Sequence, residues 1–112
     1  MTQLVNWEKL ERVFQGHPEK LRELVGEYCQ RAPELMRSIE SAEEQGDLQT
    51  IEYRAHALKG NSSLLGAFEV EQRAFELYSA ARQGDSENVS ETLPLAREAV
   101  TSTVEDLKEY LG

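Results

Sequence analysis

A histidine, a lysine and a glycine stand at helical spacing near the middle of the chain. In the stretch Ala55-His56-Ala57-Leu58-Lys59-Gly60, Lys59 and Gly60 follow His56 by three and four residues. Residues three and four apart are neighbours on one face of an α-helix. A neutral imidazole has a free lone pair that attacks electrophiles without a general base. The ammonium of Lys59 would lie close to any anionic group that the ring then carries.

A phosphoryl group suits this arrangement, because its transfer depends mainly on in-line positioning and charge compensation. Gly60 follows in the same row as the imidazole, where we expect a side chain to crowd the ring. A glycine inside a helix costs about 0.5–1 kcal/mol relative to alanine, so close approach of another molecule is the expected compensation. Ser63, and Asn61 nearer the flank, add short hydrogen-bonding side chains.

The helix around His56 has one apolar face. At 3.6 residues per turn, the predicted buried stripe consists of Ile51, Ala55, Leu58, Ser62 and Leu65. The opposite side carries Glu52, His56, Lys59, Gly60 and Ser63. We therefore expect His56 to be accessible to solvent. Leu64, also on the exposed side, is a candidate contact for a docking partner.

The rest of the chain repeats the helical spacing of apolar residues and shows no sustained alternation of the strand kind. Breaks at Gly16-His17-Pro18, Gly46-Asp47, Gly66-Ala67 and Gly84-Asp85 divide it into a short helix over about 4–14 and four long helices. We expect residues 1–112 to form a single all-α domain, an up-down-up-down four-helix bundle with a short extra N-terminal helix.

Two prolines bear on the helix bounds. Pro33 predicts a kink in the first long helix. Pro94 leaves two alternatives open for the last helix, which begins either near Thr92 with Pro94 in its first turn, or at Ser86 with Pro94 as a kink.

Charge and composition limit the classes of partner. The net charge is −9, from 21 acidic and 12 basic residues, and it repels both nucleic-acid phosphates and anionic membranes. No apolar run approaches the roughly 20 residues of a membrane span, and the first residues lack a secretory signal. We expect a cytoplasmic protein whose partners are proteins or small molecules. Cys29, the one cysteine, cannot form an internal disulfide and is predicted to be a small core residue.

The motif Ala55-His56-Ala57-Leu58-Lys59-Gly60, followed by Gly66-Ala67, resembles that of histidine-containing phosphotransfer (HPt) domains. These domains relay phosphoryl groups between receiver domains in multistep two-component signalling. The stretch 21–47, with Arg31-Ala32-Pro33-Glu34-Leu35 and the Gly46-Asp47 break, is similar to the helix that precedes the phosphohistidine helix in that family. Length, helix order and the neighbourhood of Glu76-Leu77 also fit.

The resemblance implies that His56 is the phosphoacceptor, Lys59 stabilises the charge of the phosphoryl group and Gly60 gives steric clearance, with Asn61 and Ser63 in support. It implies a donor aspartyl phosphate on a receiver domain, with Mg²⁺ held by that receiver and no cofactor bound by this chain, which lacks any nucleotide-binding motif. The implied partners are response-regulator receiver domains and a hybrid sensor histidine kinase. We expect a monomer.

The sequence departs from the family pattern at two positions. Asn61 stands where serine is common, which keeps hydrogen bonding but changes its reach. Tyr78 aligns with a position from which some members direct an amide side chain toward the imidazole. The amide contact is therefore not expected in this chain.

Other interpretations stand beside the phosphotransfer hypothesis. His56 on its own could be an ordinary surface histidine, with Gly60 as a helix C-cap before a polar turn. The same fold could serve as an adaptor that binds a receiver or kinase without carrying phosphate. Glu52 and His56, one turn apart, could share a metal, although a di-metal bundle needs repeated Glu-x-x-His pairs that this chain lacks.

Three aromatic or histidine positions are predicted to have structural roles. His17 is predicted to be a capping or solvent-exposed residue without chemistry, and it serves as a control for His56. Trp7 and Phe14 are predicted to pack the short first helix onto the end of the bundle.

Overall fold

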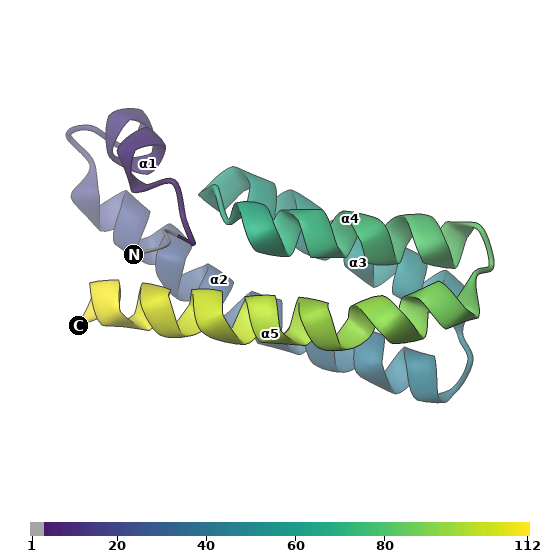
Figure 1. Cartoon of the computed structure of the whole chain (residues 1–112). Coiled ribbons are helices and arrows are strands. Elements are labelled where there is room, and N and C mark those ends of the chain that lie inside the picture. The colour runs from purple at the N-terminus through teal and green to yellow at the C-terminus, as the bar shows by residue number, and fades with distance from the viewer. Residues whose placement is uncertain (1–3) are drawn as a thin grey trace.

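The computed structural model describes residues 4–112, which form five α-helices. These are α1 (Trp7–Val13), α2 (Pro18–Glu44), α3 (Leu48–Leu65), α4 (Phe68–Arg82) and α5 (Ser86–Leu111). In the four-helix bundle, α2 and α4 each pack against both α3 and α5, and α1 lies at the end where α2 begins and α5 ends (Figure 1). The predicted all-α bundle with an extra N-terminal helix is confirmed.

The predicted breaks between the long helices are confirmed, and their capping side chains explain them. Asp47 and Asp85 are the N-caps of α3 and α5, and each carboxylate accepts a hydrogen bond at 3.1 Å from the backbone N–H three residues later. Such bonds satisfy N–H groups that have no partner within the helix. Gly66 ends α3 with a φ of 74°, a left-handed conformation that glycine adopts without steric penalty.

The first helix is shorter than predicted. It begins at Trp7 because the side chain of Asn6 caps its first turn, and the N–H of Asn6 donates to the carbonyl of Gly66 at 3.1 Å. This bond joins the start of α1 to the loop between α3 and α4. Trp7 and Phe14 pack against the core, and the Trp7 and Tyr110 ring centroids lie 4.7 Å apart. The prediction that these aromatic residues pack α1 onto the bundle is confirmed.

The alternatives for the last helix are resolved in favour of the earlier start. The helix begins at Ser86 and continues through Pro94, so a start near Thr92 is wrong. The Asp85 cap accounts for this, because it supplies an acceptor for the first turn well before the proline. Pro33 lies inside α2, which continues to Glu44, and the kink expected there stays a prediction.

One hydrophobic core runs between the four long helices. Its largest fully buried side chains include Leu35, Ile39, Ile51, Leu58, Leu65, Leu77, Val89 and Leu107. The bundle is elongated, with extents of 45 × 23 × 20 Å. Within residues 4–112, no helix combines the length and apolar character that a membrane crossing requires.

Candidate functional site

Helix α3 presents His56 to solvent. The five residues of its predicted buried stripe are each 0% exposed, and His56 is exposed, so both predictions are confirmed. Ala55 and Leu58 lie on either side of His56 in the sequence, and both are anchored in the core. Their burial fixes the rotation of α3 and therefore the direction in which the His56 side chain leaves the helix.

Tyr78 of α4 lies against the imidazole of His56. The two ring centroids are 5.3 Å apart, and the ring planes are tilted by 47°. This separation falls within the 4.5–7 Å at which aromatic rings attract one another. The Tyr78 hydroxyl accepts a hydrogen bond from Arg82 Nη1 at 2.8 Å, and the Arg82 guanidinium carbon lies 5.9 Å from the Tyr78 ring centroid. The residue of α4 that contacts the imidazole is therefore an aromatic ring.

His56 and Tyr78 line a surface hollow of about 350 Å³ together with Gln49, Glu52 and Tyr53. A water molecule in the liquid occupies about 30 Å³, so the hollow has room for a larger polar group beside the imidazole. Gln49 and Tyr53 are site residues that were not predicted from the sequence. Their spacing was the available indication, since they precede His56 by seven and three residues and so share its side of the helix.

Lys59 and Ser63 lie on the same side of α3 as His56. Lys59 is half-buried, and none of the three ion pairs found among residues 4–112 involves it. Its ammonium is therefore not neutralised by a described carboxylate. Ser63 is exposed two turns beyond His56. Leu64 is 62% exposed, which agrees with its predicted position on the outer surface.

The expected crowding at Gly60 needs correction. A Cβ atom built at Gly60 would meet nothing within 4 Å, so a side chain as small as alanine would not touch the imidazole. The position is exposed and lies inside α3. Packing within the described chain therefore gives no reason for a glycine here, and any clearance that it provides is clearance for another molecule.

Asn61 lies away from the hollow that contains His56. Its amide donates to the carbonyl of Ala57 at 3.0 Å, and the residue lines a separate groove with residues of α2 that include Leu24 and Arg31. The structure therefore brings His56 together with Tyr78, and it does not bring Asn61 to the imidazole.

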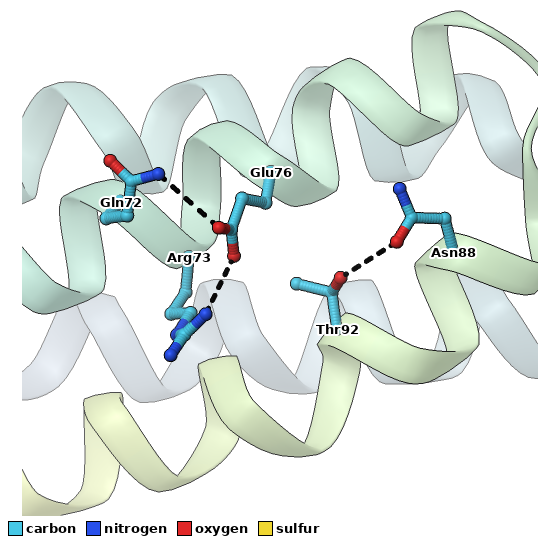
Figure 2. A network of polar contacts seen from close by, with 5 residues as sticks. All are labelled: Gln72, Arg73, Glu76, Asn88 and Thr92. Carbon is cyan, nitrogen blue, oxygen red and sulfur yellow. Dashed lines mark hydrogen bonds and ion pairs between the residues drawn. The ribbon is translucent and has the colours of Figure 1, made fainter.

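The nearby acidic side chain of Glu76 is paired on another face of α4. It accepts hydrogen bonds from Arg73 at 3.1 Å and from Gln72 at 3.4 Å. Figure 2 shows these three residues on the side of α4 that faces α5, and they line a groove there with Asn88 and Thr92 of α5. Glu76 therefore forms no ion pair with Lys59 or Arg82.

The remaining predicted positions have ordinary structural environments. His17 is exposed at the N-cap of α2, and its side chain makes no capping hydrogen bond. Cys29 is half-buried against the core, and burial raises the pKa of its thiol. Among residues 4–112, no group of three or more His, Cys, Asp or Glu side chains is placed to hold a metal ion, so the Glu52 and His56 pair has no third ligand.

The site is an exposed histidine on the surface of a four-helix bundle, with an adjacent lysine and an aromatic contact from the next helix. The family described as "Hpt domain" matches residues 23–110. The chain therefore belongs to the Hpt domain family, whose members carry out histidine phosphotransfer in phosphorelays and interact with receiver domains and kinases.

A solved structure shares the fold. The crystal structure of histidine-containing phosphotransfer protein B (HptB) from Pseudomonas aeruginosa PAO1 superposes with a TM-score of 0.91 at 21% sequence identity. The match covers 99% of this chain and 96% of that one. No match was found among curated protein sequences.

Proposed function

We propose that His56 is the phosphoacceptor of this Hpt domain, and that it takes a phosphoryl group from an aspartyl phosphate on one receiver domain and passes it to another. The observation that carries the proposal is the exposed His56 imidazole, which lies in a surface hollow near Lys59, a residue that forms no ion pair with residues 4–112. An adaptor that only binds a partner needs neither the accessible ring nor the neighbouring cation.

The transfer is a substitution at phosphorus. A lone pair on an imidazole nitrogen forms an N–P bond while the bond between phosphorus and the aspartyl oxygen breaks, and the leaving carboxylate keeps that electron pair. The ring gains positive charge as the bond forms and loses it when the proton on the other nitrogen departs to water. In the second transfer, the other ring nitrogen takes a proton back from water, an aspartate carboxylate of the next receiver attacks the same phosphorus, and the N–P bond breaks so that the imidazole leaves neutral with its lone pair restored.

Each neighbouring residue has a role in this proposal. Lys59 compensates negative charge on the phosphoryl oxygens, and Gly60 leaves room for the approaching receiver. Asn61 and Ser63 are supporting polar residues. The receiver's own carboxylates hold the Mg²⁺ that the exchange requires, and a hybrid sensor histidine kinase is the proposed upstream source. We place the exchange in the cytoplasm and expect the protein to act as a monomer.

The decisive experiment compares two histidines of the same chain. Wild type, His56→Gln and His17→Gln are each incubated with a phosphorylated receiver and Mg²⁺, and label transfer is followed by intact mass. We expect transfer to wild type and His17→Gln, and none to His56→Gln. The His56→Gln variant should remain folded because the side chain is exposed, and its circular dichroism verifies this.

Two outcomes would contradict the proposal. Transfer that persists in His56→Gln would move the acceptor elsewhere. If receivers bind the wild type but none phosphorylates it, the protein is an adaptor.

A further inference from the structure

We propose that Tyr78 is a positioning residue for phosphotransfer, which holds the His56 imidazole in one orientation through ring contact instead of through a hydrogen bond. The inference rests on the proposed function of His56 and adds the group that prepares the ring for attack. It begins from the 5.3 Å separation of the two ring centroids.

His56 is exposed, and neither of its ring nitrogens makes a hydrogen bond to another of the described residues 4–112. An exposed side chain without such bonds samples several staggered rotamers. Contact with the Tyr78 ring favours the rotamer that keeps the rings together, and His56 remains beside the hollow that both residues line.

Tyr78 is restrained by its own contacts with the core and with α4. Its ring is half-buried and packs against the bundle core, and its centroid lies 6.5 Å from that of Phe75, one turn earlier on α4. Its hydroxyl is bound by Arg82 at 2.8 Å. The Tyr78 side chain is thus restrained by the core, by the Phe75 ring and by the hydrogen bond to Arg82. It can therefore restrain the more mobile imidazole of His56.

A ring contact and an amide hydrogen bond would restrain the imidazole in different ways. An amide would restrain the imidazole by bonding one ring nitrogen, which also selects the nitrogen that carries the proton. The Tyr78 ring restrains the orientation and leaves both nitrogens unbonded. The Tyr78 hydroxyl accepts a hydrogen bond from Arg82 instead. Arg82 is thus a second cation near the site, in addition to Lys59, and it contacts the residue that packs against the imidazole.

The ring contact can be tested without any phosphoryl donor. In NMR spectra, the Tyr78 ring current should shift the imidazole proton resonances of His56. Tyr78→Leu, which keeps apolar bulk, should remove that shift, and Tyr78→Phe should keep it. Tyr110→Leu is the matched control, because Tyr110 also pairs with an aromatic ring, Trp7 at 4.7 Å, and has the Arg22 guanidinium carbon 5.9 Å from its centroid.

The positioning role is tested with phosphoramidate, a small donor that needs no docking. The imidazole nitrogen forms the N–P bond, the P–N bond of the donor breaks, and ammonia leaves. We expect Tyr78→Leu to lower the rate constant for phosphorylation of His56 by roughly three- to tenfold, from the usual strength of an aromatic pair. Tyr78→Phe should restore most of the rate, and Tyr110→Leu should match wild type.

Every result bears on the inference. An unchanged NMR shift or rate in Tyr78→Leu overturns it, and so does equal slowing by Tyr110→Leu. If neither phosphoramidate nor a receiver labels His56 in the wild type, both proposals fail. If a receiver labels His56 and phosphoramidate does not, the proposed function stands, and the rates of receiver transfer to the same variants decide the role of Tyr78. If phosphoramidate labels His56 and no receiver does, the proposed exchange with receivers fails. The role of Tyr78 is then decided by the phosphoramidate rates of the Tyr78 variants. Thermal unfolding of each variant verifies that the proteins compared are folded.

Discussion

At the scale of single residues, His56 is constrained on one side and open on the other. Its backbone is fixed by neighbours that are fully buried, and its ring rests against Tyr78. The hollow in front of the ring is lined by polar side chains such as Gln49 and by the carboxylate of Glu52. A nucleophile held in this way loses less orientational freedom when a donor arrives, which is how positioning accelerates a transfer.

Two substitutions at Gly60 should affect the stability of the protein and the docking of a receiver separately. Because a Cβ there meets nothing within 4 Å, Gly60→Ala should raise the free energy of unfolding by about 0.5–1 kcal/mol, the usual helix-propensity difference. Gly60→Leu should nevertheless slow transfer from a phosphorylated receiver, because the longer side chain enters the space that the partner needs. Denaturant unfolding and label transfer measure the two effects.

Gly26 provides the matched control for Gly60. It lies inside α2, and a Cβ at this position also meets nothing within 4 Å. Gly26→Ala should give a similar gain in stability, and Gly26→Leu should leave transfer unchanged. If Gly60→Leu transfers at the wild-type rate, the glycine does not act as clearance for a partner.

The sequence predicted which face of α3 carries the site, and it did not predict the contacts that cross to other helices. The exposure of His56 follows from the 3.6-residue period alone. The ring contact with Tyr78 depends on how α4 is placed against α3, which no local pattern encodes. The same limit applies to Asn61, whose position beside α2 could not be read from its distance along the chain from His56.

At the scale of helices, one buried hydrogen bond joins α2 to the site helix. The hydroxyls of Tyr28 and Ser62 lie 2.8 Å apart, and the two residues are 3% and 0% exposed. Ser62 belongs to the same buried stripe that turns His56 outward. This bond therefore fixes the register of α3 against α2 near the site.

A double-mutant cycle should reveal this bond. Ser62→Ala leaves the Tyr28 hydroxyl buried without a partner and should lower the free energy of unfolding by about 1–2 kcal/mol. Tyr28→Phe should cost about 1 kcal/mol, because a helical serine can turn its hydroxyl to a carbonyl in its own helix. Since removing both hydroxyls leaves no unpaired group, the double variant should be no less stable than Ser62→Ala.

Urea unfolding of the four proteins measures the coupling. The two single effects should sum to more than the effect of the double variant. Strict additivity would mean that the two hydroxyls do not stabilise one another. The interpretation of α3 register as a consequence of this bond would then be wrong.

Helix bounds were predictable where a capping residue stands in the sequence. Asp47 and Asp85 mark their helices in advance, because an aspartate before an apolar period is typical of an N-cap. The start of α1 was predicted too early because the Asn6 cap was not recognised. The alternative start of α5 near Thr92 was wrong because it assumed that Pro94 lies in the first turn. A proline is tolerated inside a long helix that tertiary packing stabilises.

At the scale of the whole molecule, polar contacts on the surface tie α2 to α5. Three such bonds join them: Arg97 to Glu40 at 2.8 Å, Ser90 to Glu43 at 2.9 Å, and Arg22 to the carbonyl of Leu111 at 2.7 Å. They lie on the pair of helices that does not carry His56. The site helices α3 and α4 are thus held by the core and by the Tyr28 bond, and their outer surface is left for a partner.

The buried Tyr28 should also make the stability of the whole bundle depend on alkaline pH. Burial raises the pKa of Tyr28 to about 12, and the hydrogen bond with Ser62 opposes this rise only in part. In the unfolded chain a tyrosine ionises near pH 10. Below about pH 10 both states hold the proton, so the contribution to stability is fully present. Above it, the unfolded chain releases a proton that the folded chain retains, and the free energy of unfolding falls as pH rises toward 12.

The expected loss between pH 10 and pH 12 is about 2 kcal/mol, from the separation of the two pKa values. Unfolding by urea at a series of pH values, on wild type and on Tyr28→Phe, isolates this contribution, because lysines and the exposed tyrosines titrate in both proteins. The stability advantage of wild type should be constant up to about pH 10, should shrink above it and should change sign before pH 12, because the loss of about 2 kcal/mol exceeds the advantage of about 1 kcal/mol. An advantage that does not change with pH would show that the Tyr28 phenol ionises alike in the folded and unfolded chain, and that α2 and α3 do not keep it from water as the 2.8 Å bond to Ser62 implies.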